Sequence, residues 1–251
     1  MSSPAFVFVH GWGQAAQTWH GQLDYFASSH EVLAVNLPGH GGTPDLPAEE
    51  WEEAILESLP DEPVVLIGWS LGGMLGLRLA LHHPTRLAGL VLLSTTPSFR
   101  LRSDWEHACA DDVFERFRES LEINEKRLLD RFFALMLQGD ALDRRRYLDI
   151  VRGAVNRHHP TSPAGLRVGL DLLDGLDLRD SLRGISVPSL VVHGRNDAIV
   201  PARAAEFLVA QMPDATLHLL PAGHAPHLTQ PESFNGILEE WCRNSISTQR
   251  R

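Results

Sequence analysis

The sequence contains little cysteine and no long apolar run. Its two cysteines, Cys109 and Cys242, are too far apart for a disulfide framework or a zinc site. No stretch of about 18 apolar residues predicts a transmembrane helix. The N-terminus also lacks the basic segment and the apolar stretch of a secretory signal. We therefore expect a cytoplasmic protein with reduced cysteines.

Nucleotide-binding motifs are also missing, since no G-x-x-x-x-G-K-[ST] or G-x-G-x-x-G begins a helix. The formal net charge of −10 argues against nucleic acid or an anionic membrane as a general partner. Residues 126–152 are the exception, because seven basic residues there outnumber four acidic ones, which gives this segment +3 and the remainder −13. Such a basic segment favours a specific acidic partner, and a solvated helix face explains it equally well.

Short apolar runs alternate with longer amphipathic stretches. The runs are typical of strands buried on both faces of a parallel sheet, and they cover residues 6–9, 32–35, 64–67, 90–93, 190–192 and 216–220. The amphipathic stretches predict helices over residues 48–59, 71–83, 202–211 and 231–246. This alternation indicates βαβ units, and hence an α/β fold with helices on both faces of a mostly parallel, doubly wound sheet.

The alternation stops between residues 99 and 183. This stretch is charged, has no clear buried strand, and shows helical spacing of apolar residues, as in Val113, Phe117 and Leu121. We interpret it as a helical cap inserted into one α/β core. The predicted core comprises residues 1–98 and 184–251.

The strongest motif is Gly68-Trp69-Ser70-Leu71-Gly72. It follows a predicted strand and begins a predicted helix, which is the context of a nucleophile elbow. Side chains at either outer glycine would collide with neighbouring backbone in such a sharp, strained turn. Ser70 would then project above the sheet as a nucleophile. The competing interpretation is an ordinary N-cap serine in a glycine-rich turn.

A serine hydroxyl needs a base to react at neutral pH. His224 lies in a loop between the last predicted strand and the last predicted helix, so it should lie above the same crevice as Ser70. His227 is the alternative. Asp197 follows another predicted strand and is our candidate for the acid that orients the base, although an Asx turn would also place an aspartate there.

The oxyanion of a tetrahedral intermediate needs backbone donors. The Leu71 N–H, directly after the nucleophile, is one candidate. The Trp12 N–H, in the His-Gly-Trp-Gly loop after the first predicted strand, is the other, and its indole is a candidate wall of an acyl pocket. No metal and no cofactor is implied by this set of residues.

Together these motifs span most of the chain and resemble the α/β-hydrolase fold. Gly11-Trp12-Gly13, Gly68-Trp69-Ser70-Leu71-Gly72-Gly73 and His224-Ala225-Pro226 resemble more narrowly the pimeloyl-acyl-carrier-protein methyl ester esterases of biotin synthesis. That family cleaves a methyl ester from a pimeloyl chain carried on acyl carrier protein. The sequence departs from the family pattern at three points. The family usually has aspartate where Asn36 stands and an apolar residue where His227 stands. The first strand pair common in this fold is also absent from the predicted strands.

The resemblance implies further site residues. The acyl chain would be contacted by Trp12, Ser70, Leu71 and His224 and by the cap residues Phe132, Phe133, Ala134, Leu135 and Met136. Acyl carrier protein would be bound by Arg127, Arg131, Arg144, Arg145 and Arg146. We expect a monomeric serine carboxylesterase that forms an acyl-enzyme. The alternatives are a general short-chain carboxylesterase, a carbon–carbon bond hydrolase of the same fold and, in another class, a ligand-binding receptor with slow turnover.

Overall fold

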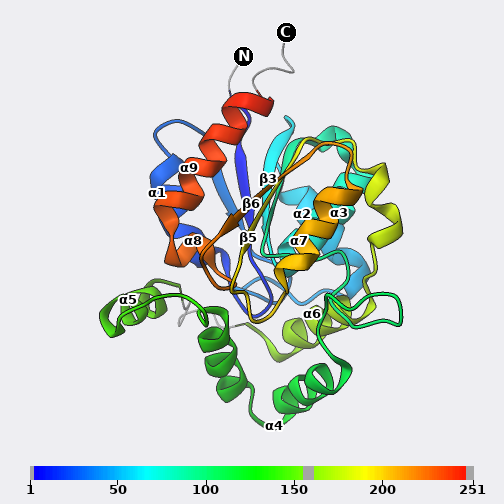
Figure 1. Cartoon of the computed structure of the whole chain (residues 1–251), viewed down its shortest axis with the longest axis vertical. Coiled ribbons are helices and arrows are strands. Elements are labelled where there is room, and N and C mark those ends of the chain that lie inside the picture. The colour runs from blue at the N-terminus through cyan, green and yellow to red at the C-terminus, as the bar shows by residue number, and fades with distance from the viewer. Residues whose placement is uncertain (1–2, 155–160, 247–251) are drawn as a thin grey trace.

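The computed structural model describes residues 3–154 and 161–246. Within these residues a single parallel sheet has the strand order β2-β1-β3-β4-β5-β6 (Figure 1). The strands are β1 (Phe6–Val9), β2 (Val32–Val35), β3 (Val64–Trp69), β4 (Leu87–Leu93), β5 (Ser189–Gly194) and β6 (Ala215–Leu220). The parallel α/β architecture predicted from the alternating apolar runs is therefore confirmed.

The central strands are longer than their apolar runs. Strand β3 continues through Gly68 and Trp69 because both residues still pair with β4. Strands β1, β3 and β5 are buried along their whole length, as expected for strands covered on both faces. Strand β2 lies at an edge, where Leu33 is 38% exposed.

Helices cover both faces of the sheet (Figure 1). On one face lie α2 (Trp51–Ser58), α3 (Leu71–His82) and α7 (Ala202–Gln211). On the other lie α1 (His20–Phe26), α8 (Pro226–Thr229) and α9 (Pro231–Trp241). Each face has its own apolar core, one including Trp51, Leu75 and Leu208 and the other Phe26 and Phe234.

Several short elements complete this part of the chain. They are the 3₁₀ helices Ala16–Trp19, Ala48–Glu50, Pro84–Arg86 and Arg179–Gly184 and a π-helical turn at Cys242–Ile246. The helix predicted over residues 231–246 is therefore α-helical only as far as Trp241, and its last five residues form the wider π-helical turn. Helices α1 and α8 were not predicted from the sequence.

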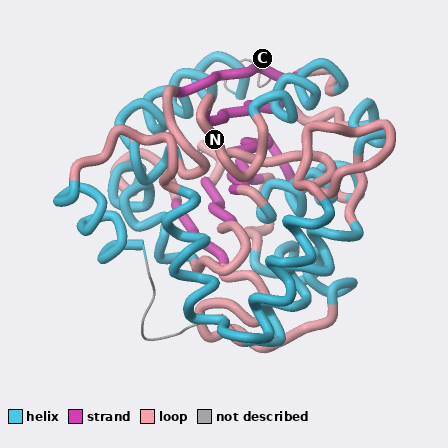
Figure 2. The backbone as a smooth tube through the Cα atoms, turned by 60° about the horizontal axis from the view of Figure 1, so that its bottom comes forward, coloured by secondary structure: helices cyan, strands magenta, loops and turns pink. Residues whose placement is uncertain are grey.

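The inserted stretch is helical. It contains α4 (Asp111–Met136), α5 (Arg144–Ala154) and α6 (Pro163–Gly175), which lie beyond the end of the sheet that comes forward in Figure 2. Helix α4 is kinked at Asn124, where the backbone is extended (φ −161°, ψ 86°). The Asn124 side chain accepts a hydrogen bond from the Arg127 N–H (2.9 Å) and so caps the second half of the helix.

The two ends of the insert meet beside the sheet. Ser98 and Asp177 form an isolated bridge, and the Leu178 N–H donates to the Pro97 carbonyl (2.9 Å). The division into a core (1–98 and 184–251) and a cap (99–183) stays a prediction. Residues 1–2 and 247–251 of the predicted core and residues 155–160 of the predicted cap lie outside the described residues. No helix in the described ranges is long and apolar enough to span a membrane.

Candidate active site

Ser70 occupies the turn between β3 and α3. Its backbone has a positive φ (φ 54°, ψ −116°), a strained conformation for a residue with a side chain. The turn closes because Gly68 has no side chain, since a Cβ there would collide with the Gly72 carbonyl. Ser70 is thus presented at the N-terminus of α3, where the helix dipole favours negative charge.

The loop after β1 lies directly beside Ser70. A Cβ on Gly11 would lie 3.1 Å from the Ser70 Cβ, and a Cβ on Gly72 would lie 2.6 Å from the carbonyl oxygens of Val9 and His10. These glycines therefore let the start of α3 approach the end of β1. The approach places the backbone around Trp12 next to the serine.

Trp12 and Leu71 lie on the two segments that meet at this junction, and their N–H groups are the candidate oxyanion donors. Within the described residues neither N–H has a hydrogen-bond acceptor. Both residues are buried, and buried N–H groups without a partner are uncommon in folded proteins. An oxyanion formed by attack of Ser70 needs hydrogen-bond donors close to the serine, and these two N–H groups could supply them.

Asp197 and His224 are hydrogen bonded. The His224 Nδ1 lies 2.7 Å from the Asp197 Oδ2, and both side chains are almost completely buried. The loop after β5 can approach the loop after β6 because Gly194 lacks a side chain, since a Cβ there would collide with the Gly223 carbonyl. The structure thus brings together an acid and an imidazole from two separate loops.

Asp197 is surrounded by four donors. Its Oδ1 accepts the N–H groups of Ile199 (2.8 Å) and Val200 (2.9 Å), while its Oδ2 faces His224 and, at 3.2 Å, the His193 Nε2. Burial alone would raise the pKa of Asp197, but the charge of His224 and the hydrogen bonds from His193 and His224 outweigh burial and hold it well below its usual range. Asp197 is therefore ionised at neutral pH.

His224 leaves its second ring nitrogen free. Its Nε2 is buried and has no hydrogen-bond partner among the described residues, Ser70 included. The Trp69 Nε1–H donates to the His224 carbonyl (2.9 Å), which fixes the backbone of this residue from the side of the elbow. Catalytic hydrogen bonds are often long without substrate and shorten when substrate binds.

His227, the alternative base, is located differently. It is fully buried between two indoles, with ring centroids 4.3 Å from Trp19 and 4.6 Å from Trp69. Burial and the neighbouring His224 lower its pKa well below the usual value. The hydrogen bond to Asp197 belongs to His224, so the geometry favours His224 as the base.

Two further buried histidines hold the loops around Trp12. The His10 Nε2 accepts the Leu37 N–H (3.0 Å), and the His40 Nε2 accepts the Gly13 N–H (3.3 Å). Burial lowers the pKa of His10 to about 3, with a further contribution from His40, and lowers that of His40 to about 4. Both rings are therefore neutral in the folded protein.

These histidines predict acid sensitivity. Below about pH 6.5 the unfolded chain takes up protons that buried His10 and His40 do not, so the free energy of unfolding falls as the pH is lowered. Between pH 7 and 5 we expect a loss of roughly 2 kcal/mol for each histidine, measured by urea unfolding. His40→Gln should show a smaller loss than the wild type, and an equal loss would contradict this origin.

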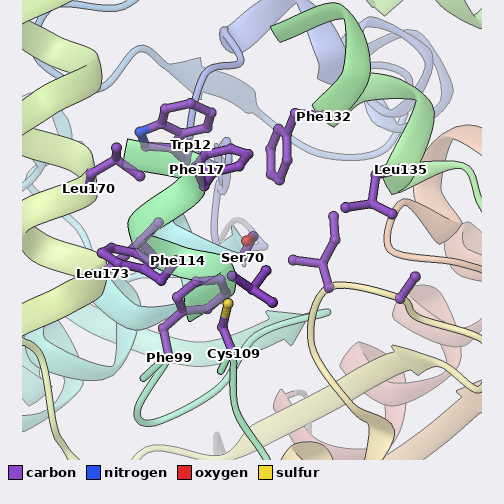
Figure 3. A pocket seen from close by; sticks show the side chains of 13 residues that line it. Trp12, Ser70, Phe99, Cys109, Phe114, Phe117, Phe132, Leu135, Leu170 and Leu173 are labelled. Atoms are coloured by element: carbon purple, nitrogen blue, oxygen red, sulfur yellow. The ribbon is translucent and has the colours of Figure 1, made fainter. Parts of the chain in front are cut away.

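A pocket opens above Ser70 between the sheet and the insert (Figure 3). It encloses about 90 Å³, and Ser70 contributes the single hydroxyl among the described residues that line it. The other lining residues are apolar or weakly polar and are Trp12, Phe99, Cys109, Val113, Phe114, Phe117, Phe132, Leu135, Leu170, Leu173, Ala198 and Ile199. Figure 3 shows the aromatic side chains grouped around the serine. The pocket suits an apolar chain attached to a reactive carbonyl.

Five consecutive residues of α4 were predicted to contact substrate, and the structure places two of them in the pocket, Phe132 and Leu135. Phe133 and Met136 instead pack into the core on the α9 face, and Ala134 is exposed. The reason is helical periodicity, since residues spaced by three or four share a face and adjacent residues do not. Leu71 and His224 were also predicted contacts, but they are fully buried and lie outside the lining set.

Most of the pocket wall was not predicted from the sequence. The signal available was the spacing of Val113 and Phe117 on a charged helix, which indicated an apolar stripe but not what the stripe faces. Phe99, Cys109, Leu170 and Leu173 approach Ser70 only through the fold of the insert. His193 beside Asp197 was also missed, because a histidine at the end of a strand has no signature of its own.

The predicted carrier-binding arginines are all exposed. Arg127 and Arg131 lie on α4, and Arg144, Arg145 and Arg146 form the first turn of α5. Among the residues that the structure describes, no cluster of three or more histidine, cysteine, aspartate or glutamate side chains is arranged to hold a metal ion.

Residues 4–231 match the family model described as the alpha/beta hydrolase fold. The chain is 38% identical over 237 residues to a pimeloyl-[acyl-carrier protein] methyl ester esterase of Nitrosomonas europaea, with 93% of each chain covered. It is also 38% identical over 251 residues to the protein of the same name from Aromatoleum aromaticum, covering 97% of this chain and all of the relative.

Solved structures of similar fold include an esterase from Exiguobacterium antarcticum, with a TM-score of 0.86 and 21% identity over 97% of this chain and 93% of the other. An enol-lactonase from Burkholderia xenovorans has a TM-score of 0.83 and 20% identity over 97% and 93% of the two chains. At these identities the similarity shows a common fold.

Proposed function

Since this chain belongs to the alpha/beta hydrolase family, we propose that it is a serine carboxylesterase that hydrolyses the methyl ester of pimeloyl-acyl carrier protein in biotin synthesis. Ser70 is the nucleophile, His224 the general base and Asp197 the acid that orients it. The observation that carries this proposal is the buried Asp197–His224 hydrogen bond, together with a strained Ser70 that lines an apolar pocket.

The reaction has two halves. His224 accepts the Ser70 proton at Nε2 while the serine oxygen attacks the ester carbonyl, and the N–H groups of Trp12 and Leu71 bind the oxyanion. Collapse of this intermediate expels methanol, which receives its proton from His224. Water then attacks the acyl-enzyme by the same route and releases the free acid.

The carrier protein is the acidic partner in this proposal. Acyl carrier protein is named in the relatives, and exposed arginines on α4 and α5 offer it complementary charge. Arg100, Arg118 and Arg179 of the insert are each held in ion pairs. In the described part of the chain, by contrast, no ion pair holds any of the predicted carrier-binding arginines, which are Arg127, Arg131, Arg144, Arg145 and Arg146.

The position of Arg144, Arg145 and Arg146 is unfavourable for the isolated helix. They occupy the first turn of α5, which has no acidic residue, although the helix dipole favours negative side chains there by about 0.3–1 kcal/mol each. Positive charge at this position supports an intermolecular role. Charge reversal here should not unfold α5, which makes these residues suited to a test.

We expect reversal of Arg144, Arg145 and Arg146 to glutamate to lower kcat/KM for the carrier-bound ester by at least tenfold, because charge complementarity mainly sets the association rate. Hydrolysis of p-nitrophenyl butyrate should change less than twofold. Arg203→Glu on α7 is the control, since it reverses an exposed charge on the core. Equal losses on both substrates would reject a carrier-binding role for this turn.

The substrate itself is tested by comparing pimeloyl-acyl carrier protein methyl ester with p-nitrophenyl butyrate at low and high salt. A large preference for the carrier substrate that decreases with salt is expected from electrostatic association. Rapid cleavage of the small ester alone would instead indicate a general short-chain carboxylesterase.

A further inference from the structure

The turn that follows α4 contacts the loop that carries His224. The His224 N–H donates to the Met136 carbonyl (2.9 Å), and the N–H of Gly223 donates to the Asp140 Oδ2 (3.0 Å). Both acceptors belong to the insert, and both donors belong to the loop after β6. The backbone on the N-terminal side of the candidate base is therefore held by the insert and not by the sheet alone.

The same turn also contacts the loop that carries Asp197. The side-chain amide of Asn196 donates to the Gly139 carbonyl (3.0 Å). Asn196 immediately precedes Asp197, so this hydrogen bond joins the insert to the acid loop as well. The two members of the Asp–His pair thus share one neighbour outside the core.

Glycines allow this close contact on both sides. A Cβ on Gly223 would lie 2.5 Å from the Gln138 carbonyl oxygen and 2.7 Å from the Asp140 Oδ2. Gly139 has a φ of +93°, and a Cβ there would lie 2.6 Å from the Asn196 Cβ. A larger residue at either position would separate the insert from the loops.

Asp140 is the charged member of this contact and is half-buried. Burial raises its pKa, and nearby Asp197 acts in the same direction, while hydrogen bonds from Thr229 and from the Gly223 N–H oppose the rise. A carboxylate that is partly desolvated and close to a second buried carboxylate is unfavourable unless its hydrogen bonds compensate. The bond to Gly223 is one of those compensating interactions.

Helix α4 connects this contact to the pocket. Phe132 and Leu135 line the pocket, and Met136, the last residue of α4, accepts the His224 N–H. The side chains that would touch the acyl chain are thus within one helical turn of the carbonyl that holds the base loop.

From these contacts we propose that Asp140 is a positioning residue: its carboxylate holds the Gly223 N–H and thereby fixes the His224 imidazole relative to Ser70. The inference rests on the proposed roles of Ser70 and His224. Because a displacement of about 1 Å in a reacting group can lower a rate by up to 10²-fold, loss of this bond affects the chemical step more than substrate binding.

The test compares Asp140→Ala, which removes the acceptor, with Asp140→Asn, whose amide oxygen can still accept the Gly223 N–H. The readouts are the rate at which a fluorophosphonate probe labels Ser70, and kcat and KM for p-nitrophenyl butyrate. We expect Asp140→Ala to lower the labelling rate and kcat by tenfold or more with KM within twofold of the wild type. Asp140→Asn should retain at least half of both rates.

Asp130→Ala, which removes an exposed carboxylate from α4, is the matched control and should leave both rates unchanged. If Asp140→Ala does not fold, as judged by its melting temperature, Asp140→Ser replaces it, since a serine hydroxyl is too short to reach the Gly223 N–H. Wild-type rates in the acceptor-free variant, or equal losses in Asp140→Ala and Asp140→Asn, would overturn the proposal. Labelling of Ser70→Ala would instead reject the proposed nucleophile, so the two failures are distinguishable.

Discussion

Replacement of Ser70 by alanine is expected to lower kcat by on the order of 10⁶-fold, the size of the loss when the nucleophile of a Ser–His–Asp triad is removed. The hydroxyl cannot be replaced by a neighbour, because Ser70 contributes the single hydroxyl among the described pocket-lining residues. Steady-state hydrolysis of p-nitrophenyl butyrate, with an active-site titration of the wild type, measures the effect.

Folding should not limit this experiment. Ser70 is strained at positive φ, and alanine occupies that conformation at a similar cost, so the melting temperature should change little. A variant that folds and retains most activity would remove Ser70 from the mechanism. A wild type that binds esters but turns over negligibly would indicate a ligand-binding receptor instead of an esterase.

Replacement of Asp197 by asparagine is expected to lower kcat/KM by about 10⁴-fold. The four donors around the carboxylate leave no position for an amide NH₂. If the NH₂ faces His224, the imidazole must accept at Nδ1 and carry its proton at Nε2, which prevents it from accepting the Ser70 proton. If it faces Ile199 and Val200, their N–H groups lose their acceptor.

The asparagine variant should therefore lose both activity and stability, the second by about 1–3 kcal/mol for the unsatisfied buried donors. Activity on p-nitrophenyl butyrate and urea unfolding measure the two losses. Asp214→Asn, at an exposed position before β6, is the control. Retention of more than a tenth of wild-type activity in Asp197→Asn would argue that another carboxylate orients the base.

Much of the fold follows from local sequence patterns. Continuous apolar runs such as Phe6–Val9 predict strands buried on both faces, and the structure contains a strand at each of the predicted runs. Strand ends were less predictable, since Gly68 and Trp69 are part of β3 through pairing with β4, and pairing depends on residues distant in sequence. The kink at Asn124 was likewise not predicted, because an asparagine within a charged stretch does not by itself indicate a helix start.

The candidate site was predictable where chemistry requires a local motif. The elbow at Ser70 and the short loops around Asp197 and His224 have recognisable sequences, and the structure places the last two in hydrogen-bond contact. The pocket wall was not predictable in the same way. Whether Phe132 or Phe133 faces Ser70 depends on the rotation of α4 about its own axis, which is set by packing against the core.

The lining of the pocket bears on what happens after the ester bond breaks. Hydrolysis of a neutral ester leaves a carboxylate, and the described residues around Ser70 include no cation that would neutralise it. Away from the Trp12 and Leu71 N–H groups and the start of α3, an anion in such apolar surroundings is costly. A newly formed acid whose carboxylate leaves these donors is therefore bound less well than the ester from which it came. Product release and rejection of the unesterified acid are therefore properties of the pocket as a whole, and neither requires a dedicated side chain.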